Sequence, residues 1–194
     1  AALPMAAVTA LQALRNKGSI REGHDVLILG SGGGVGTYAV QLAKYFGASV
    51  TGVCSTKNVE QTIALGADHV IDYTKEKFTS GNRSYDIILA VNGNYPLSAC
   101  RRILKPNGNY VMVGGSFSQI FKSMLFGWVL SFGSRKMRFL AAKPNQKDLE
   151  FIVSLANEGK IRPLIDKQFP LDKAAEAFHY VSEGHARGKV IVNL

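Results

Sequence analysis

The sequence predicts an α/β fold: a doubly wound, parallel, six-stranded sheet with helices on both faces. Three observations predict it. Short apolar runs rich in β-branched residues alternate with amphipathic segments along the 194 residues. The first such run, residues 26–29, leads into five glycines within residues 30–36. An apolar face at helical spacing follows the glycines and ends at Gly47.

The predicted elements follow one another as repeated strand–helix units. Strands are expected at residues 26–29, 50–54, 69–71, 85–91, 109–113 and 136–141, with a last one at 189–192. Helices are expected at residues 4–16, 35–46, 58–65, 96–104, 117–130, 148–157 and 171–182. Asn58 begins its helix as a cap, and Gly66 ends it. Right-handed crossovers would make the sheet parallel and place a ligand beyond the carboxyl ends of its strands.

The glycines form the fingerprint of a Rossmann dinucleotide site. This motif requires a glycine turn between a strand and a helix. The turn lets a pyrophosphate approach the free backbone N–H groups at the N-terminus of the helix. The motif here is Ser31-x-Gly33-x-x-Gly36, with serine at the usual first glycine. A P-loop is excluded because no Lys-Ser/Thr follows the glycines. A methyltransferase glycine loop is the nearer alternative.

The residues after the second strand favour NADP(H). An NAD site keeps a carboxylate about twenty residues past the fingerprint to bind the ribose 2′-hydroxyl. Here Ser55, Thr56 and Lys57 stand at that place, with no acid among them. A hydroxyl and an ammonium attract a 2′-phosphate, whereas a carboxylate repels it. This argues against NAD and against a methyltransferase, although Lys57 could simply be a solvated residue that opens the next helix.

Composition indicates a single basic domain. Lys and Arg number 23 against 14 Asp and Glu, for a formal charge of +9. A nucleic acid or membrane partner is not indicated, because the basic residues are scattered in runs of two at most. Two cysteines predict a reducing, cytoplasmic compartment. No signal peptide is evident, and the start at Ala1 suggests a fragment or a processed chain.

The chain resembles the coenzyme-binding half of a medium-chain dehydrogenase/reductase, in the quinone oxidoreductase and zinc-type alcohol dehydrogenase-like branch. The resemblance rests on the helix at residues 1–14, the fingerprint helix at 34–44, and the segment at 65–73. It also rests on Gly159-Lys160-Ile161-Arg162-Pro163 and on Gly184-His185-Ala186-Arg187-Gly188-Lys189-Val190. Together these blocks cover the chain from end to end.

The resemblance implies a role for individual residues. Those implied to bind the cofactor are Thr9, Ser31, Gly32, Gly33, Gly34, Val35, Ser55, Lys57, Tyr73, Asn92, Val113, Gly114, Phe139 and Leu140. Residues 31–35 would hold the pyrophosphate, and Ser55, Lys57 and Tyr73 the 2′-phosphate. Phe139 and Leu140 would approach the nicotinamide, which Thr9 would touch from the other side. Ala90-Val91-Asn92-Gly93 departs from the family's Asp-x-Val/Ala-Gly pattern, so the contact of Asn92 is open.

The family also carries a barrel-like substrate domain that has no counterpart in these residues. We therefore expect one NADP-binding domain over residues 1–194, in which residues 1–20 and 160–194 would pack on the absent domain. The last strand would pair with a sheet of that domain. The four histidines and two cysteines are far apart in sequence, so no metal site is predicted.

Two further patterns are better explained without a function. Tyr73-Thr74-Lys75-Glu76-Lys77 fits the Y-x-x-x-K pair of short-chain dehydrogenases, but it follows the third strand instead of lying on a later helix. The apolar stretch at residues 120–132 is too short to span a bilayer and contains Lys122. We expect a buried or subunit-interface helix there, with an interfacial membrane helix as the alternative.

The predicted function is that of the cofactor-binding part of an NADPH-dependent oxidoreductase. It would transfer a hydride to a quinone, an enone or a carbonyl of a small-molecule substrate. The alternative is a non-catalytic module that binds NADPH or RNA. No residue is assigned as the general acid, and the chain alone is expected to be inactive. A homodimer is expected through the edge strand at residues 136–141, beside the sole tryptophan, Trp128.

Overall fold

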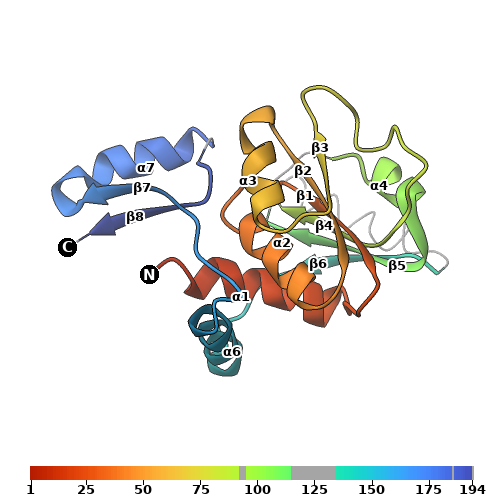
Figure 1. Cartoon of the computed structure of the whole chain (residues 1–194), viewed down its shortest axis with the longest axis horizontal. Helices are drawn as coiled ribbons and strands as arrows, with labels where there is room; N and C mark the ends of the chain where they lie inside the picture. Colours follow the sequence, from red (N-terminus) through yellow and green to blue (C-terminus); the bar gives the residue numbers. More distant parts are fainter. Residues whose placement is uncertain (92–94, 115–133, 185, 194) are drawn as a thin grey trace.

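The computed structural model describes residues 1–91, 95–114, 134–184 and 186–193 (Figure 1). Its main sheet is parallel, with strand order β3-β2-β1-β4-β5-β6. The strands are β1 (Asp25–Leu29), β2 (Ser49–Cys54), β3 (His69–Asp72), β4 (Tyr85–Val91), β5 (Leu104–Val113) and β6 (Lys136–Leu140). The direction of winding reverses between β1 and β4, which is the doubly wound order. The predicted fold class is confirmed.

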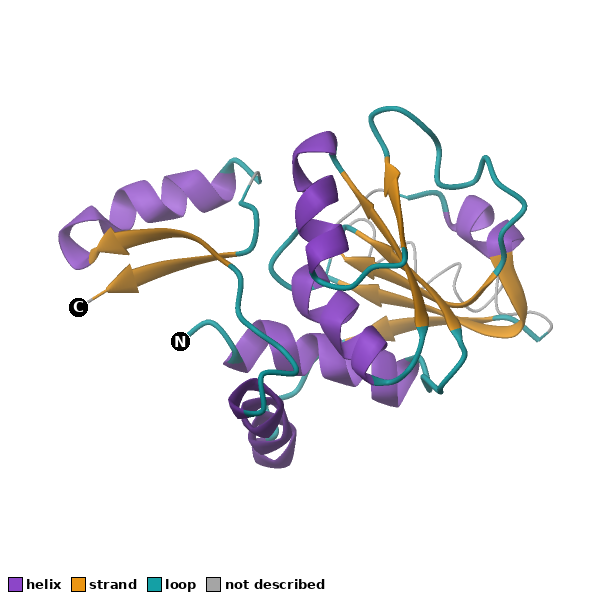
Figure 2. Cartoon of the chain, viewed as in Figure 1, coloured by secondary structure: helices purple, strands orange, loops and turns teal. Residues whose placement is uncertain are grey.

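Helices lie on both faces of the sheet (Figure 2). They are α1 (Pro4–Gln12), continued by the π-helical turn η1 (Ala13–Lys17), α2 (Gly36–Tyr45), the 3₁₀ turn η2 (Thr56–Asn58), α3 (Val59–Ala64), α4 (Leu97–Ile103) and α6 (Gln146–Asn157). Val26 and Ile28 of β1 face the cluster packed around α1, α2 and α6. Leu27 and Leu29 face the second cluster, which contains residues of α4. Because a strand buried on both faces needs apolar residues, β1 is apolar from Val26 to Leu29, after the partly exposed Asp25.

The structure corrects several predicted boundaries. The helix expected at residues 4–16 changes to π-helical hydrogen bonding at Ala13. Strand β5 already begins at Leu104, where the sequence analysis expected the end of a helix. Leu104 pairs with Tyr85, and after a register shift Asn109 pairs with Ile87. Between these pairs Asn107 has a φ of +63°, so the Pro-Asn-Gly segment bulges out of the strand instead of preceding it.

A second, smaller unit follows the main sheet along the chain. It contains β7 (Ile165–Pro170), the 3₁₀ turn η3 (Leu171–Lys173), α7 (Ala174–Ser182) and β8 (Lys189–Asn193). Strands β7 and β8 form a separate two-stranded parallel sheet, which lies apart from the main one in Figure 1. The sequence analysis missed β7 and left β8 to pair with a sheet outside the chain. In the structure β8 pairs with β7 on one side, and its pairing with a sheet of a further domain stays a prediction.

The two ends of the chain pack differently. Ala7, Ala10 and Leu11 of α1 are fully buried in the main core of this chain. Phe178 of α7, in contrast, is 77% exposed, and Leu171 is 57% exposed. Apolar side chains left in water favour an additional packing partner for the second unit. The packing of residues 1–20 and 160–194 on a further domain stays a prediction.

Among the described strands, β6 lies at one edge of the main sheet, the position that the dimer prediction names. The apolar helix expected at residues 117–130, with Trp128, lies outside the described residues. Among the helices that the structure does describe, none is long and apolar enough to cross a membrane.

Candidate cofactor-binding cleft

A cleft of about 520 Å³ opens beyond the carboxyl ends of β1, β2 and β4. This is the point at which the winding of the sheet reverses, where ligands of this architecture bind. Its walls come from six parts of the chain. The lining residues are Met5, Ala6, Gly30, Gly32, Gly33, Gly34, Val35, Cys54, Ser55, Lys57, Asn58, Tyr73, Val91, Tyr95, Val181, Gly184, Ala186, Gly188 and Lys189.

The glycine turn between β1 and α2 forms the floor of the cleft, and its glycines have different tasks. Gly30 has a φ of +89°, and a Cβ there would lie 2.3 Å from the Val91 carbonyl oxygen. A Cβ on Gly36 would lie 2.1 Å from the Gly30 carbonyl oxygen, so this glycine lets α2 pack against the turn. The space beside Gly33 is open, since a Cβ added there would lie 3.7 Å from its nearest atom. Gly33 therefore leaves room for a ligand.

The start of α2 offers unused hydrogen-bond donors to the cleft. Within the described residues, the N–H groups of Gly34 and Val35 have no acceptor. Such N–H groups, together with the positive end of the helix dipole, bind phosphates. The residues present therefore fit the pyrophosphate of a dinucleotide.

Ser31 turns away from this floor. Its hydroxyl donates to the Val53 carbonyl at 3.2 Å and lies 3.4 Å from the Thr62 hydroxyl, and its side chain is fully buried. Its backbone N–H donates to the same Val53 carbonyl at 3.0 Å. This serine joins the turn to β2, and its expected contact with a pyrophosphate stays a prediction.

The wall beyond β2 is free of negative charge. Ser55, Lys57 and Tyr73 all line the cleft, as the sequence analysis expected. No Asp or Glu is among the lining residues that the structure describes. The nearby carboxylate of Asp72 is turned into the neighbouring loop, where it accepts hydrogen bonds from the Thr56 and Thr74 hydroxyls at 2.5 and 2.7 Å. An anionic group can therefore approach this wall without meeting a carboxylate.

Asp72 holds in place the loop that carries Lys57. The hydrogen bond from Thr56 is the main cause that lowers the pKa of Asp72 from 3.8 to about 2, with further contributions from Thr74 and Lys75. The ionised form is thus stabilised by folding. Its contribution to stability is complete above the unfolded pKa of 3.8 and is lost as the pH falls through about 2.

We expect Asp72→Asn to remove this pH dependence. The variant should be less stable than the wild type at pH 6, because one amide oxygen cannot replace both carboxylate oxygens, which accept from the Thr56 hydroxyl and from the Thr74 hydroxyl and N–H. The difference between the two unfolding free energies should shrink between about pH 4 and pH 2, as the wild-type carboxylate becomes protonated. Urea unfolding at several pH values measures it. A difference that stays constant down to pH 2 would contradict the role given to Asp72.

Two basic residues near the cleft were missed by the sequence analysis. The Lys189 side chain crosses the glycine turn, and its Nζ lies 3.8 Å from the Cβ position of Gly34. Arg187 donates from Nη2 to the Lys57 carbonyl at 2.7 Å and from Nε to the Asn58 amide oxygen at 3.3 Å. Arg187 therefore fastens the second unit to the wall of the cleft. The Arg-Gly-Lys block marked both residues, but no pattern showed which part of the chain they would meet.

The other predicted residues lie outside the cleft. Thr9 is 7% exposed, and its hydroxyl donates to the Met5 carbonyl at 2.6 Å. The ends of β5 and β6 run side by side, with Met112 paired to Phe139 and Val113 to Leu140. Gly114 follows Val113 with a φ of +68°. Val113, Gly114, Phe139 and Leu140 lie at the ends of β5 and β6, at the same edge of the sheet as the cleft. The contact of these residues and of Thr9 with a nicotinamide stays a prediction. Asn92 lies outside the described residues.

The part of the chain that the structure describes contains no group of three or more His, Cys, Asp or Glu side chains placed to hold a metal ion.

A family model for zinc-binding dehydrogenases matches residues 65–192. The chain belongs to this family. Over 202 residues it is 37% identical to the chloroplast envelope quinone oxidoreductase homolog of Arabidopsis thaliana, covering 99% of this chain and 60% of the relative. It is also 37% identical to the mitochondrial NAD(P)H oxidoreductase RTN4IP1 of Homo sapiens, covering 100% of this chain and 55% of that protein.

Among solved structures, the quinone oxidoreductase from Coxiella burnetii superposes with a TM-score of 0.88 at 32% identity. The match covers 100% of this chain and 60% of that one. An NAD-dependent alcohol dehydrogenase superposes with a TM-score of 0.80 at 25% identity, covering 100% and 57%. The resemblance to quinone oxidoreductases and alcohol dehydrogenases is confirmed. The chain spans about 60% of the length of these dehydrogenases or slightly less.

The family match and relatives named NAD(P)H oxidoreductases support a nicotinamide cofactor for this chain. They overturn the cytoplasmic prediction, which is wrong: relatives that match the whole chain are named as chloroplast or mitochondrial proteins. A cysteine count separates oxidising from reducing compartments, and it cannot separate the cytosol from the interior of an organelle.

Proposed function

We propose that this chain binds NADP(H) and serves an oxidoreductase that transfers a hydride to a quinone, an enone or a carbonyl compound. The names of the relatives support the quinone class. The preference for NADP(H) is supported chiefly by one observation: the wall at Ser55 and Lys57 contains no carboxylate. A ribose 2′-phosphate there would meet an ammonium and two hydroxyls, those of Ser55 and Tyr73.

The residues of the cleft could bind a dinucleotide at two points along its length. The free N–H groups of Gly34 and Val35 and the Lys189 ammonium would bind the pyrophosphate. Lys57 would bind the 2′-phosphate. With these two anchors fixed, the nicotinamide would extend along the sheet edge toward β5 and β6. The cofactor supplies the hydride, while this chain's residues set its position and exclude water from one side.

Calorimetric titration with NADPH and NADH tests the cofactor preference. We expect NADPH to bind more tightly to the wild-type chain. Lys57→Ala should weaken NADPH binding by about tenfold or more, because a charge-assisted contact contributes about 1.5–3 kcal/mol. The same substitution should barely change NADH binding, which makes NADH the internal control. Equal affinities for the two cofactors in the wild type would contradict the proposal.

We also propose a homodimer formed through β6. Among the strands that the structure describes, β6 is the last one on its side of the main sheet, which is where a second copy would extend the sheet. Light scattering should give twice the mass of one chain. Phe139→Lys should shift the mass toward the monomer, whereas His69→Lys on the opposite edge strand, β3, should not. A monomer at high micromolar concentration would contradict this interface.

A further inference from the structure

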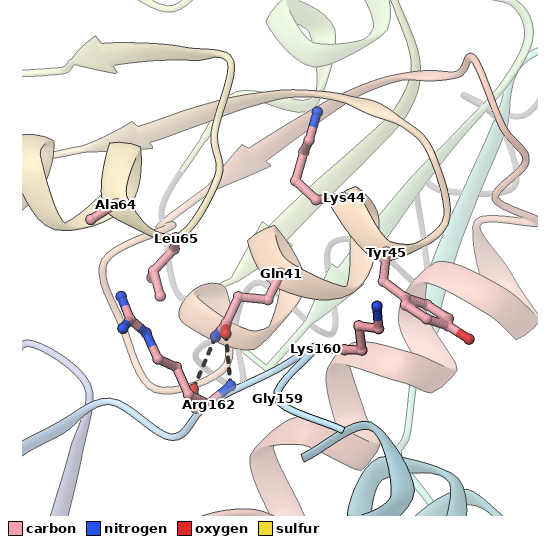
Figure 3. A pocket seen from close by; sticks show the side chains of 8 residues that line it. All are labelled: Gln41, Lys44, Tyr45, Ala64, Leu65, Gly159, Lys160 and Arg162. Atoms are coloured by element: carbon pink, nitrogen blue, oxygen red, sulfur yellow. Dashed lines mark hydrogen bonds between the residues drawn. The ribbon is translucent and has the colours of Figure 1, made fainter. Parts of the chain in front are cut away.

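The second unit, from β7 to β8, is attached to the rest of the protein at two places. The first is the chain just before β7, which Gln41 of α2 holds (Figure 3). The Gln41 Oε1 atom accepts from the Arg162 N–H at 2.8 Å, and its Nε2 donates to the Arg162 carbonyl at 3.1 Å (Figure 3, dashed lines). Gln41 is 7% exposed, so this attachment is shielded from water.

The second attachment is the side chain of Arg187, in the turn between α7 and β8 that faces α3 in Figure 1. Its guanidinium donates to the Lys57 carbonyl at 2.7 Å and to the Asn58 amide oxygen at 3.3 Å. We call these two hydrogen bonds the clasp. Among the hydrogen bonds of the described residues, only the clasp joins residues 165–193 to the main unit. The docking of this side of the second unit therefore depends on one side chain.

The backbone of Arg187 is fixed within the second unit. Its N–H donates to Asp166 Oδ2 at 2.9 Å, and the Tyr180 hydroxyl donates to the same oxygen at 2.7 Å. The next residue, Gly188, has a φ of +143°, and a Cβ there would lie 2.5 Å from the Leu164 carbonyl oxygen. The turn thus moves with the second unit as one piece, and the clasp forms or breaks with the position of that unit.

Asn58 connects the clasp to both phosphate-facing parts of the cofactor-binding cleft. Its Nδ2 donates to the Ser55 hydroxyl at 3.4 Å. The same side chain fills the space beside Gly32, where a Cβ would lie 2.5 Å from Nδ2 and 2.7 Å from Cγ. Asn58 lines the cleft, whereas Arg187 is exposed and does not line it. Arg187 therefore acts on the cleft through Lys57 and Asn58.

We propose that Arg187 is a positioning residue for the selection of NADP(H) over NAD(H). This inference rests on the proposed function. A lysine side chain loses much rotamer freedom when its ammonium binds a phosphate. Because the clasp already fixes the backbone of Lys57, less freedom remains to be lost when a 2′-phosphate binds. NAD(H) has no 2′-phosphate and gains little from the clasp.

The effect must also run in the opposite direction. If the closed clasp favours the 2′-phosphate, then the 2′-phosphate favours the closed clasp by the same factor. NADPH should therefore hold the second unit in place more firmly than NADH does.

Calorimetry of Arg187→Lys tests the positioning role. The variant keeps the charge but cannot donate both hydrogen bonds of the planar fork. We expect NADPH to bind about fivefold more weakly, while NADH binding should barely change. Arg21→Lys, at an exposed arginine that does not line the cleft, is the matched control and should leave both affinities unchanged.

The outcomes separate this inference from the proposed function. A wild-type chain that prefers NADPH, with an Arg187→Lys variant that prefers it equally, would overturn the inference alone. An equal loss of both cofactors in the variant would show a merely structural role and overturn it too. Equal wild-type affinities would contradict the cofactor proposal and this inference with it.

Limited digestion of the wild-type chain with trypsin tests the reciprocal effect without any variant. Trypsin must take the Arg187 side chain out of the clasp before it can cleave after this residue. At saturation, NADPH should slow this cleavage about threefold more than NADH, because cleavage follows the population of the open form. Cleavage after Arg83, an exposed loop residue that does not line the cleft, should respond equally to both cofactors. Equal protection of Arg187 by NADPH and NADH would overturn the inference.

Discussion

Replacing Gly36 by alanine is expected to lower the free energy of unfolding by about 3 kcal/mol or more, the upper range for an overpacked site. The added Cβ would lie 2.1 Å from the Gly30 carbonyl oxygen and 2.8 Å from the Ser31 Cα. Both atoms belong to backbone, which cannot move aside as a flexible side chain can. To relieve the contact, α2 would have to withdraw from the turn, and the core around α2 would open.

Urea unfolding followed by circular dichroism measures this loss. The urea concentration at the midpoint of unfolding should fall. The slope of the unfolding free energy against urea concentration should stay the same, because the size of the folded unit does not change. If the variant does not fold at all, soluble yield and the far-ultraviolet spectrum report the same loss. A Gly36→Ala chain as stable as the wild type would show that the helix and the turn are not packed as described.

Replacing Gly33 by alanine should leave the fold intact and abolish most cofactor binding. The nearest atom to its Cβ position is 3.7 Å away, an ordinary contact, and Gly33 is not among the glycines with positive φ. The new methyl group would occupy the floor of the cleft where a pyrophosphate must approach the amides. We expect about hundredfold weaker binding of NADPH and NADH alike, equivalent to about 2.7 kcal/mol.

The two glycine variants control each other. Unfolding measurements should separate them, since Gly33→Ala is expected to stay within about 0.5 kcal/mol of the wild type. Titration with both cofactors then separates Gly33→Ala from Lys57→Ala, which should affect NADPH alone. Undiminished binding by Gly33→Ala would mean that the pyrophosphate does not lie on the glycine turn.

The sequence predicts the main sheet well because its strands are buried on both faces. Residues 26–29 are an unbroken apolar run, and residues 85–91 are interrupted only by Asp86, which is the pattern of central strands in a parallel sheet. Strand β7 was missed for the opposite reason. Ile165–Pro170 is largely half-exposed or exposed and carries Asp, Lys and Gln, so its pattern does not differ from that of a surface loop.

The site was predictable where a local pattern specifies it. The glycine turn and the Ser55–Lys57 wall follow the motif, and the structure brings them together in one cleft. The inward turn of Ser31 depends on Val53 and Thr62, which lie 22 and 31 residues further along the chain. The position of Arg187 depends on Lys57, which lies 130 residues away. Such pairings arise from the fold, and no local pattern encodes them.

The position of Lys189 in the chain has a consequence for synthesis on the ribosome. Most of the cleft is lined by residues 5–6 and by residues between 30 and 95, and the rest by residues of the segment 181–189. Because domains fold progressively as the chain emerges from its N-terminus, the main sheet can form while the last unit is still being made. The main sheet would therefore form before residues 181–189 complete the cleft, and cofactor loading would follow the synthesis of that unit.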